Sequence, residues 1–485
     1  MPRAATTFKL RLILHLAGAA SSVVDSWPKI GLMATWYRPN WAKLIWGGFL
    51  GNKAFHEIRD PIHVFVRLDS DERAVLDSLP FQRLRHIHQL ALTYLVYPGT
   101  THKRFEHSLG VMELAGRIFD VVTDPSNTDD RIKELLPDLA KPERRAYWRR
   151  VVRMAALCHD MGHLPFSHAA EELLPTAVNH EQITAAIIQS KELKRIWKTM
   201  TPPLRTSDVV KLALGPKEAK GQTFSLLEGL LSEIIVGDAF GADRMDYLLR
   251  DSYHAGVAYG RFDHYRLVDT LRILPPPPSG ERGQSEELQL GVEHGGIHSA
   301  EAMNLARYFM YSQLYFHPVR RIYNIHLMDF LKDWIKGGKF KTAPAEHLLL
   351  TDNEVTAGLA LAARMPNARG HDSARRIIQR EHFKLVYQQN PDDAKVNDKP
   401  ATAVYNALSR KFAKAQLRLD ARPAKPGSLD FPVRMHDGRI VSSLAVSKII
   451  QSMPSAVVDL VFAEQKTVKQ AQEFIRDNRS SIMGN

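Results

Sequence analysis

The first regular pattern of the chain is an alternation of apolar and polar residues in EIRDPIHVFVRLD (57–69). Alternation is typical of a half-buried β-strand, and the proline in the middle marks a turn, so we expect a hairpin here. From about residue 70 to residue 120 the apolar period changes to three or four residues. This spacing predicts helices, with one apolar face formed by Leu76, Leu79, Leu84, Ile87 and Leu90.

Helical periodicity then dominates the chain. It predicts a helix in HSLGVMELAGRIFDVV (107–122) and another in RRAYWRRVVRMAALCHD (144–160), which Gly162 and Pro165 should stop. Helical patterns continue through residues 168–250 with few strand signals, and residues 299–334 form a long helical stretch with Ser299 as its N-cap.

Strand and loop signals gather in the second half of the chain. Residues 274–287 read as a loop and 288–296 as a small β element, whereas QNPDDAKVNDKP (389–400) reads as an exposed loop or a domain boundary. FPVRMHDGRIVSSL predicts a hairpin around Asp437 and Gly438, followed by a terminal helix in VKQAQEFIRDN. The expected fold is therefore mostly α, with a helical body and a smaller α+β lobe at the C-terminal end.

Composition and charge indicate the class of protein, its redox compartment and the charge of its partners. The chain has 485 residues, 44% hydrophobic and 24% charged, which is ordinary for a globular protein of two to four domains. Its one cysteine, Cys158, excludes an internal disulfide and indicates a reducing, cytoplasmic setting. The net charge of +12 suits polyanionic partners. Residues 131–153 hold eight Lys/Arg against three Asp/Glu, which indicates either a solvated helix face or a surface that binds phosphate or single-stranded nucleic acid.

The N-terminal segment differs from the rest. Arg3, Lys9 and Arg11 precede LILHLAGAASSVV, an outline of a secretory signal whose apolar run is short and holds His15. We expect either that Met33 is the native start or that residues 1–32 are a mobile extension. No segment is expected to span a membrane, and PNWAKLIWGGFLG (39–51) is interpreted as a packing segment rather than a membrane contact.

Candidate metal ligands crowd into CHDMGHLPFSH (158–168). His159 and Asp160 are adjacent, and on a helix His163 would lie one turn beyond His159, on the same face. His168 follows the break at Pro165, which leaves its direction open. Imidazole together with carboxylate suits Mn, Fe, Zn or Mg.

Three interpretations compete for these residues. His159-Asp160-x-x-His163 has the spacing of the zinc-protease motif with Asp in place of Glu, but Gly162 and Pro165 end the helix that such a protease needs. The histidines could also be satisfied members of a polar core. The third interpretation is an HD phosphohydrolase, which needs an upstream His, a His-Asp doublet and a distant Asp. His107 in KRFEHSLG, the doublet, and Asp243 in ADRMDYLLRD supply them in that order.

These motifs carry a family resemblance. FQRLRHIHQL, YPGTTHKRFEHSLGV, CHDMGHLPFSH, NHE and ADRMDYLLRDSYHAG together resemble the HD-domain dNTP triphosphohydrolases, including the dGTPases, and most of all the sterile-alpha-motif- and HD-domain-containing group with its bacterial relatives. The resemblance runs from about Phe55 to the C-terminus, and no sterile-alpha-motif domain is seen before it. It implies an N-terminal extension (1–54), an HD-domain helical core as the catalytic domain (55–335) and the C-terminal lobe (336–485).

The resemblance also implies roles for particular residues. One or more divalent ions would be held by His107, His159, Asp160 and Asp243. The catalytic set on the phosphate side would be His163, His168, Glu171, His180 and Glu181, with His180 as the acid. The groups that bind the triphosphate and the sugar would be Gln89, Arg104, Arg244, Tyr247, Asp251, Arg307, Tyr311 and Tyr315. Tyr247 and Tyr315 would leave no room for a 2′-hydroxyl.

The implied reaction is hydrolysis of dNTPs to deoxynucleosides and triphosphate, which would control or deplete the dNTP pool. An activating GTP or dNTP would bind near Asp77, Gln82 and Arg85, and a homo-oligomer, by preference a tetramer, is expected. Two other hypotheses stay open: an HD phosphodiesterase or nuclease, and a single-stranded nucleic-acid-binding protein. No glycine-rich phosphate loop of the kinase or ATPase type is present in the sequence.

Overall fold

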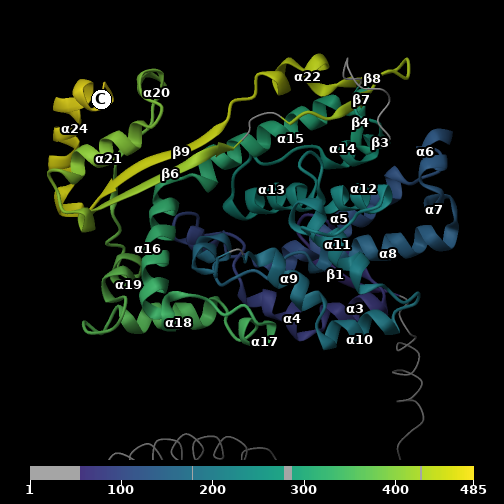
Figure 1. The fold of residues 1–485 in the computed structure, drawn as a ribbon, viewed down its shortest axis with the longest axis horizontal. Helices are drawn as coiled ribbons and strands as arrows, with labels where there is room; N and C mark the ends of the chain where they lie inside the picture. The colour runs from purple at the N-terminus through teal and green to yellow at the C-terminus, as the bar shows by residue number, and fades with distance from the viewer. Residues whose placement is uncertain (1–54, 177, 278–286, 426–428, 485) are drawn as a thin grey trace, which may run out of the picture. The chain divides into compact units, whose positions relative to one another are not determined.

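The computed structural model describes residues 55–484 apart from 177, 278–286 and 426–428. The expectations for residues 1–54 and for most of the loop at 274–287 therefore lie outside the described residues. Residues Phe55–Asn485 cluster as one unit by their contacts, and Figure 1 shows this unit as a largely helical body with small sheets. None of its described helices is long and apolar enough to cross a membrane.

The predicted N-terminal hairpin is present. Strands β1 (His56–Asp60) and β2 (Val64–Leu68) pair antiparallel, with Ile58 opposite Val66. The helical segment that follows is broken into short pieces: α3 (Ser70–Leu76), α4 (Leu79–Arg83), η1 (Leu84–His86) and η2 (Ala91–Leu95). Helix α3 begins in a capping box in which Asp69 accepts from the Glu72 amide, as a short helix in water requires.

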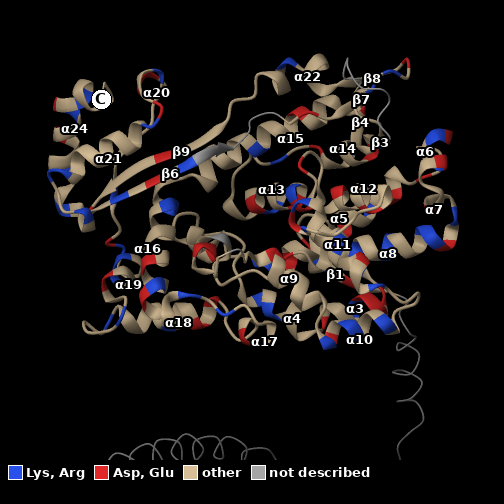
Figure 2. Cartoon of the chain, viewed as in Figure 1, with Lys and Arg blue, Asp and Glu red and all other residues tan. Residues whose placement is uncertain are grey.

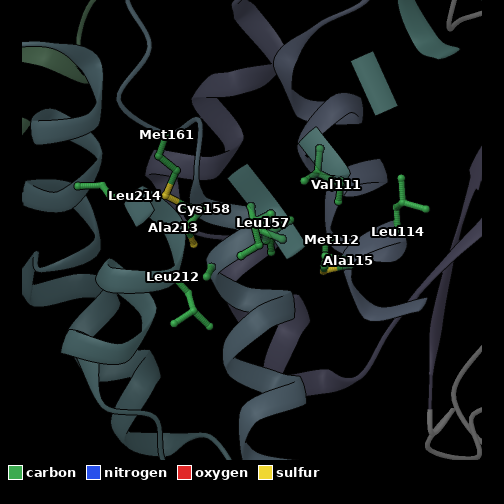
Figure 3. Close-up of a cluster of buried hydrophobic side chains, with 14 of the residues drawn as sticks. Val111, Met112, Leu114, Ala115, Leu157, Cys158, Met161, Leu212, Ala213 and Leu214 are labelled. Carbon is green, nitrogen blue, oxygen red and sulfur yellow. The ribbon is translucent and has the colours of Figure 1, made fainter. Parts of the chain in front are cut away.

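Five long helices form the centre of the body: α5 (Arg104–Val122), α8 (Pro142–Cys158), α11 (Thr206–Glu218), α12 (Leu226–Val236) and α13 (Ala242–Ala255). The first two confirm the helices predicted at 107–122 and 144–160. Their facing sides are apolar and dry, since Val111, Met112, Ala115 and Leu157 are 0% exposed. Figure 3 shows α5, the end of α8 and Leu212–Leu214 of α11 meeting in this core. The packing fixes where α8 ends relative to His107.

The basic run at 131–153 lies mostly on α8, and four of its six arginines are ion-paired. Arg144 pairs with Asp138, Arg149 with Asp120, Arg150 with Asp69 and Asp71, and Arg153 with Glu72. Figure 2 shows blue residues on α8 and red residues on the elements beside it. Paired guanidinium groups attract a polyanion less than free ones do, so the run behaves mainly as a structural helix face.

Two further small sheets complete the unit. One has the order β3-β4-β7-β8, from β3 (Leu271–Leu274), β4 (Gln289–Glu293), β7 (Pro432–Arg434) and β8 (Ile440–Ser442). The other has the order β5-β9-β6, from β5 (Lys384–Gln388), β9 (Ala456–Ala463) and β6 (Leu417–Lys425). The hairpin predicted around Gly438 is confirmed as β7–β8, where Gly438 takes φ 84°. Because β7 also pairs with β4, the predicted boundary at 335/336 is bridged by a sheet.

Two local predictions are wrong. Residues 389–400 hold helix α20 (Pro391–Val396), which Asn390 caps by accepting from the Asp393 amide. Helix α15 (Ile297–Phe309) begins after Gly296, two residues before the expected cap at Ser299. It continues into a π-helical segment, η5 (Met310–Tyr315), before α16 (Pro318–Trp334).

The remaining helical elements surround the central helices and the sheets. They are α6 (Asp130–Leu135), α7 (Pro137–Ala140), η3 (Ser167–Leu173), α9 (His180–Ile188), α10 (Lys191–Thr199), α14 (His264–Thr270), η4 (His294–Gly296), η6 (Lys336–Gly338), α17 (Pro344–His347), α18 (Asp352–Ala362), α19 (His371–Ile378), α21 (Pro400–Ser409), η7 (Lys414–Gln416), α22 (Ser443–Val446), α23 (Lys448–Gln451), η8 (Gln465–Thr467) and the predicted terminal helix α24 (Val468–Met483). The mostly α fold with a smaller strand-containing C-terminal region is confirmed.

Candidate metal centre and substrate pocket

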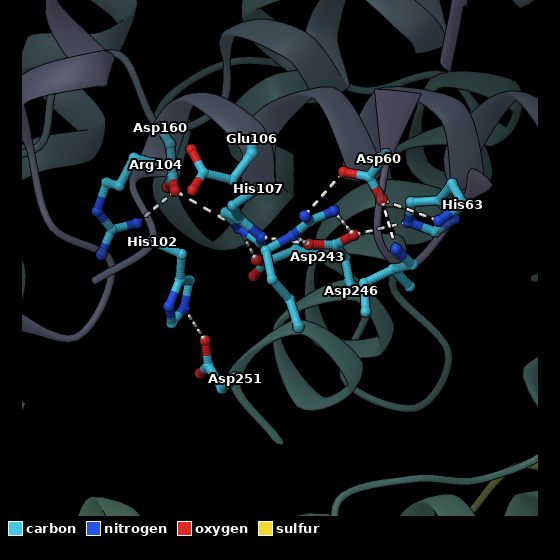
Figure 4. Close-up of polar contacts among 12 residues, drawn as sticks. Asp60, His63, His102, Arg104, Glu106, His107, Asp160, Asp243, Asp246 and Asp251 are labelled. Atoms are coloured by element: carbon cyan, nitrogen blue, oxygen red, sulfur yellow. Dashed lines mark hydrogen bonds and ion pairs between the residues drawn. The ribbon is translucent and has the colours of Figure 1, made fainter. Parts of the chain in front are cut away.

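The four predicted metal ligands converge from two helices and a turn. The first turn of α5 supplies His107, the turn that follows α8 supplies His159 and Asp160, and the first turn of α13 supplies Asp243. The His107 Nε2 atom lies 3.0 Å from an oxygen of Asp243 and 3.6 Å from one of Asp160. The His159 Nε2 atom lies 3.6 Å from the same Asp243 oxygen. Figure 4 shows His107 between Asp160 and Asp243.

A turn, rather than a helix face, presents the doublet. Helix α8 ends at Cys158, and residues 159–162 form turns, so the expectation that His163 lies one helical turn beyond His159 is wrong. Gly162 lies in this turn and makes a close approach to α9. A Cβ atom there would sit 2.2 Å from the His180 carbonyl oxygen and 2.4 Å from the Thr184 amide. The glycine lets this turn dock against the start of α9, which brings His180 to the site.

A buried carboxylate behind the site orients His107. Asp246 is 0% exposed and accepts hydrogen bonds from His107 Nδ1 at 2.8 Å and His63 Nε2 at 2.7 Å. Arg250 donates to it as well and is held by Asp60. Burial alone would raise the pKa of Asp246, but Arg250 and the two histidines hold that pKa well below its ordinary value. Because Nδ1 donates to Asp246, His107 presents Nε2 to the ligand cluster.

The residues present fit a divalent cation. His159 donates from Nδ1 to the Ala156 carbonyl at 2.7 Å, while its buried Nε2 atom has no hydrogen-bond partner. Ligand atoms of His107, His159 and Asp243 all lie within 4.8 Å of one another. Two imidazole nitrogens with two carboxylates suit Mn, Fe, Mg or Zn. A metal ion would satisfy a buried imidazole nitrogen that makes no hydrogen bond and lies near carboxylates.

Two stacked imidazoles lie beside this cluster. The rings of His163 and His180 are 3.9 Å apart, and His163 Nε2 is 3.1 Å from an Asp160 oxygen. His180 Nδ1 contacts Glu171 and lies 3.2 Å from Glu181. Burial would lower the pKa of His180, but the hydrogen bond that it donates to the Glu171 carboxylate raises this pKa. Burial, Arg104 and His180 hold the pKa of His163 well below its ordinary value. One imidazole therefore favours carrying a proton and its neighbour does not.

His168 lies in η3. Its side chain is outside the described part of the chain, so its catalytic role stays a prediction.

The predicted sugar-binding residues surround one carboxylate. Asp251 accepts from the Tyr315 hydroxyl and from His102 Nε2, both at 2.7 Å. The ring of Tyr315 packs edge-to-face on Tyr247 at 6.2 Å and on Tyr311 at 5.1 Å. Gln89, Tyr247, Asp251, Tyr311 and Tyr315 all line a cavity of about 1930 Å³, whose wall also includes His159, Asp160 and Asp243.

Of the three arginines predicted to bind phosphate, one lines the described cavity and two do not. Arg104 lines the cavity, ion-pairs with Asp160 and donates from Nε to Ser167 Oγ at 2.8 Å. Arg244 and Arg307 are outside the described lining; burial and then the neighbouring Arg244 charge lower the pKa of Arg307. Arg320, which sequence reasoning missed, does line the cavity, and burial lowers its pKa to about 10. Buried cations near one another favour a multiply charged anion as their partner.

The predicted activator residues lie at the end of α3, in α4 and in η1. Arg85 donates to Gln82 Oε1 at 2.8 Å, and its guanidinium lies 3.5 Å from the centre of the Phe105 ring. Gln82 donates to the Leu76 carbonyl, and Asp77 pairs with Arg73 at 3.1 Å. Gln82 and Arg85 are brought together, and the role of all three residues stays a prediction.

Comparisons with known proteins can be set against this geometry. Residues 104–251 match the family described as HD domain, and residues 262–415 match the one described as HD associated region. All four predicted ligands fall within the first match.

Relatives extend over more of the chain. An uncharacterized protein of Methanocaldococcus jannaschii is 37% identical over 265 residues, 55% of this chain and 47% of that protein. The human protein named deoxynucleoside triphosphate triphosphohydrolase SAMHD1 is 29% identical over 371 residues, 69% of this chain and 55% of that protein. The chain thus spans about half the length of the curated relatives it matches.

A solved structure covers nearly the whole described unit. A hypothetical protein from Aquifex aeolicus has a TM-score of 0.70 and 32% identity to this chain, over 86% of this chain and 99% of that one. Together with the two matching regions, this relative shows that the chain belongs to the HD-domain family of metal-dependent phosphohydrolases, with an HD-associated region after the HD domain.

Proposed function

We propose that this protein hydrolyses deoxynucleoside triphosphates to deoxynucleosides and inorganic triphosphate, and so controls or depletes a dNTP pool. One observation carries the proposal: metal-ligand candidates His159, Asp160 and Asp243 line the same cavity as the hydrogen-bonded pair Asp251 and Tyr315. A metal cluster and a group that can bind a hydroxyl are thus joined by one space, as a substrate with a polyphosphate and a sugar requires.

The side chains suit the chemistry of that reaction. A divalent ion held by His107, His159, Asp160 and Asp243 would supply positive charge and Lewis acidity toward the phosphates and a water. Arg104, beside these ligands, would add a cation for the triphosphate. When the water oxygen bonds to the α-phosphorus and the bond to O5′ breaks, O5′ needs a proton. His180, whose pKa Glu171 raises, would donate it.

Tyr247 and Tyr315, the pair proposed to exclude a 2′-hydroxyl, form what we call the sugar gate. Substitution of Tyr315 tests its selectivity. Tyr315 packs its ring against Tyr247 and donates to Asp251, so Tyr315→Ala removes both the steric wall and one hydrogen bond. We expect the preference for dNTPs over NTPs, measured as the ratio of kcat/KM values, to fall by about tenfold or more.

Tyr315→Phe is the matched variant for this test, because it keeps the ring and removes only the hydroxyl that donates to Asp251. It should retain most of the exclusion of ribonucleotides while kcat/KM falls for dNTPs. Unchanged selectivity in Tyr315→Ala would remove this residue from the sugar gate.

Our proposals for regulation and assembly rest on the same family resemblance. We propose that GTP or a dNTP activates the enzyme near Asp77, Gln82 and Arg85, and that the chain forms a homo-oligomer, by preference a tetramer. Arg85 and Gln82, already hydrogen-bonded to each other, could offer donors to a guanine base. Light scattering with and without added nucleotide tests this assembly.

The nearest rival is an HD phosphodiesterase or nuclease. Assaying dNTPs, NTPs, a cyclic dinucleotide and a single-stranded DNA oligonucleotide with Mn or Mg separates the two. The proposal expects dNTPs to be consumed fastest, and turnover confined to the cyclic nucleotide or the DNA would favour the rival. The ion-paired arginines of α8 give no support to nucleic-acid binding as the main role.

A further inference from the structure

Asp352 connects the HD-associated region to two loops of the pocket. It is the first residue of α18 and is 1% exposed. One carboxylate oxygen accepts from the His88 amide at 2.7 Å and from His88 Nδ1 at 2.6 Å. The other accepts from the Phe166 amide at 2.6 Å. Figure 1 shows α18 beside α17 at the edge of the body, yet this carboxylate reaches inward to both loops.

The carboxylate is not needed to cap its own helix. Thr351 caps α18 by accepting from the Asn353 amide, and Glu354 accepts from the Thr351 amide, which completes a capping box. All three donors that Asp352 accepts come from residues more than 180 positions away in sequence. The side chain therefore serves tertiary positioning.

Each loop that Asp352 holds leads directly to a pocket residue. His88 precedes Gln89, which lines the cavity, and the His88 carbonyl accepts from Ser167 Oγ at 2.9 Å. Phe166 precedes Ser167, which accepts from Arg104. Arg104 in turn pairs with the candidate metal ligand Asp160. One chain of contacts thus runs from Asp352 to both the sugar side and the phosphate side.

The loop at 166–167 needs such an anchor. Phe166 and Ser167 have φ values of 56° and 57°, a left-handed conformation that residues with a Cβ atom rarely adopt. A second bridge runs in parallel: Arg83 donates to the Leu350 carbonyl at 2.8 Å and to the His163 carbonyl at 2.9 Å. Residues 350–352 thus contact segments that lead to the sugar side and to the phosphate side of the pocket.

We propose that Asp352 is a positioning residue that fixes the Gln89 loop and the Phe166–Ser167 loop in their substrate-binding arrangement. Through it the HD-associated region sets the geometry of the HD-domain site. The consequence for catalysis rests on the proposed dNTPase function, whereas the consequence for the two loops does not.

Hydrogen–deuterium exchange measures the loops without any substrate. In the full-length wild-type protein, peptides covering 86–90 and 164–168 should each contain a slowly exchanging amide, although both lie outside long helices, because the His88 and Phe166 amides donate to Asp352. Asp352→Asn keeps the shape but turns an NH₂ group toward at least one donor, so exchange in both peptides should speed up by about tenfold. Glu354→Gln, which removes the same charge from the same helix, should leave both peptides unchanged.

Fast exchange of either peptide in the wild-type protein would overturn the proposal even if the variant failed to fold. Unchanged exchange in Asp352→Asn, or a change in only one peptide, would overturn it as well.

Steady-state kinetics with a dNTP and Mn then separate positioning from simple loss of folded protein. Misplaced contacts should raise KM and lower kcat, with kcat/KM reduced about 10²-fold, whereas partial unfolding would lower the apparent kcat at constant KM and contradict the positioning role. A wild-type protein that hydrolyses no dNTP would refute the proposed function, and the exchange result would still decide the role of Asp352.

Discussion

Replacing Asp160 with alanine is expected to abolish metal binding and turnover while the fold survives. Asp160 belongs to the ligand cluster, pairs with Arg104 and lies 3.1 Å from His163. Its loss removes one of two carboxylates from the centre and leaves the Arg104 charge beside His159 and His163. The contribution of a metal ion is several kcal/mol of transition-state stabilisation, so kcat/KM should fall by at least about 10³-fold.

Calorimetric titration with Mn and a dNTP assay measure the two effects separately. Asp130→Asn, at a side chain 95% exposed on α6, is the control and should match the wild-type protein. The double variant His159→Ala with Asp160→Ala should behave like the single one, because residues that act as a unit are not additive. Near-normal hydrolysis by the double variant would show that the site has been assigned wrongly.

Replacing Asp246 with asparagine is expected to give the largest loss of stability of the single substitutions considered. The Asp246 carboxylate is fully buried and accepts hydrogen bonds from His107, His63 and Arg250. Removing one partner of a buried charged group costs about 3–5 kcal/mol. The same change frees the His107 ring to rotate, and loss of such an outer partner lowers metal affinity about 10–100-fold.

Urea unfolding and Mn titration of the folded variant test the two parts. Asp120→Asn is the matched control, because Asp120 pairs with Arg149 in an ion pair whose side chains are 46% and 42% exposed. Exposed pairs contribute about 0–1 kcal/mol, so its unfolding free energy should change by less than that. A loss in Asp246→Asn no larger than in the control would contradict the network.

Helix and hairpin positions were predictable because local periodicity and turn residues determine them. Residues 57–69 alternate and Asp437-Gly438 supplies a turn, and both hairpins are present. The helix at 391–396 also had a local signal, Asn390 as cap and Pro391 in the first turn, which the polar composition of the segment obscured. Gly296 likewise begins α15 earlier than Ser299 because the apolar Ile297 packs into the core.

The convergence of the four candidate ligands was predictable from motif order, but their surroundings were not. Asp243, Asp246, Tyr247, Arg250 and Asp251 recur at alternating intervals of three and one along α13, a spacing that could have indicated Asp246 and Arg250. His63, His102 and Asp352 lie 149 to 264 positions away from their partners in the sequence. Such contacts depend on tertiary packing, and no local pattern encodes them. The turn at 159–162 also depends on packing, because Gly162 is needed only once α9 lies against it.

The identity of the reaction products tests the central claim most directly. The purified full-length protein is incubated with Mn or Mg and an equimolar dNTP mixture, and separately with NTPs, and the products are separated by ion-pair chromatography. The account predicts deoxynucleoside and inorganic triphosphate in equal amounts from dNTPs and little product from NTPs. Omitting one dNTP at a time would expose an activator. Deoxynucleoside monophosphates with pyrophosphate, or no dNTP turnover with either metal, would contradict it.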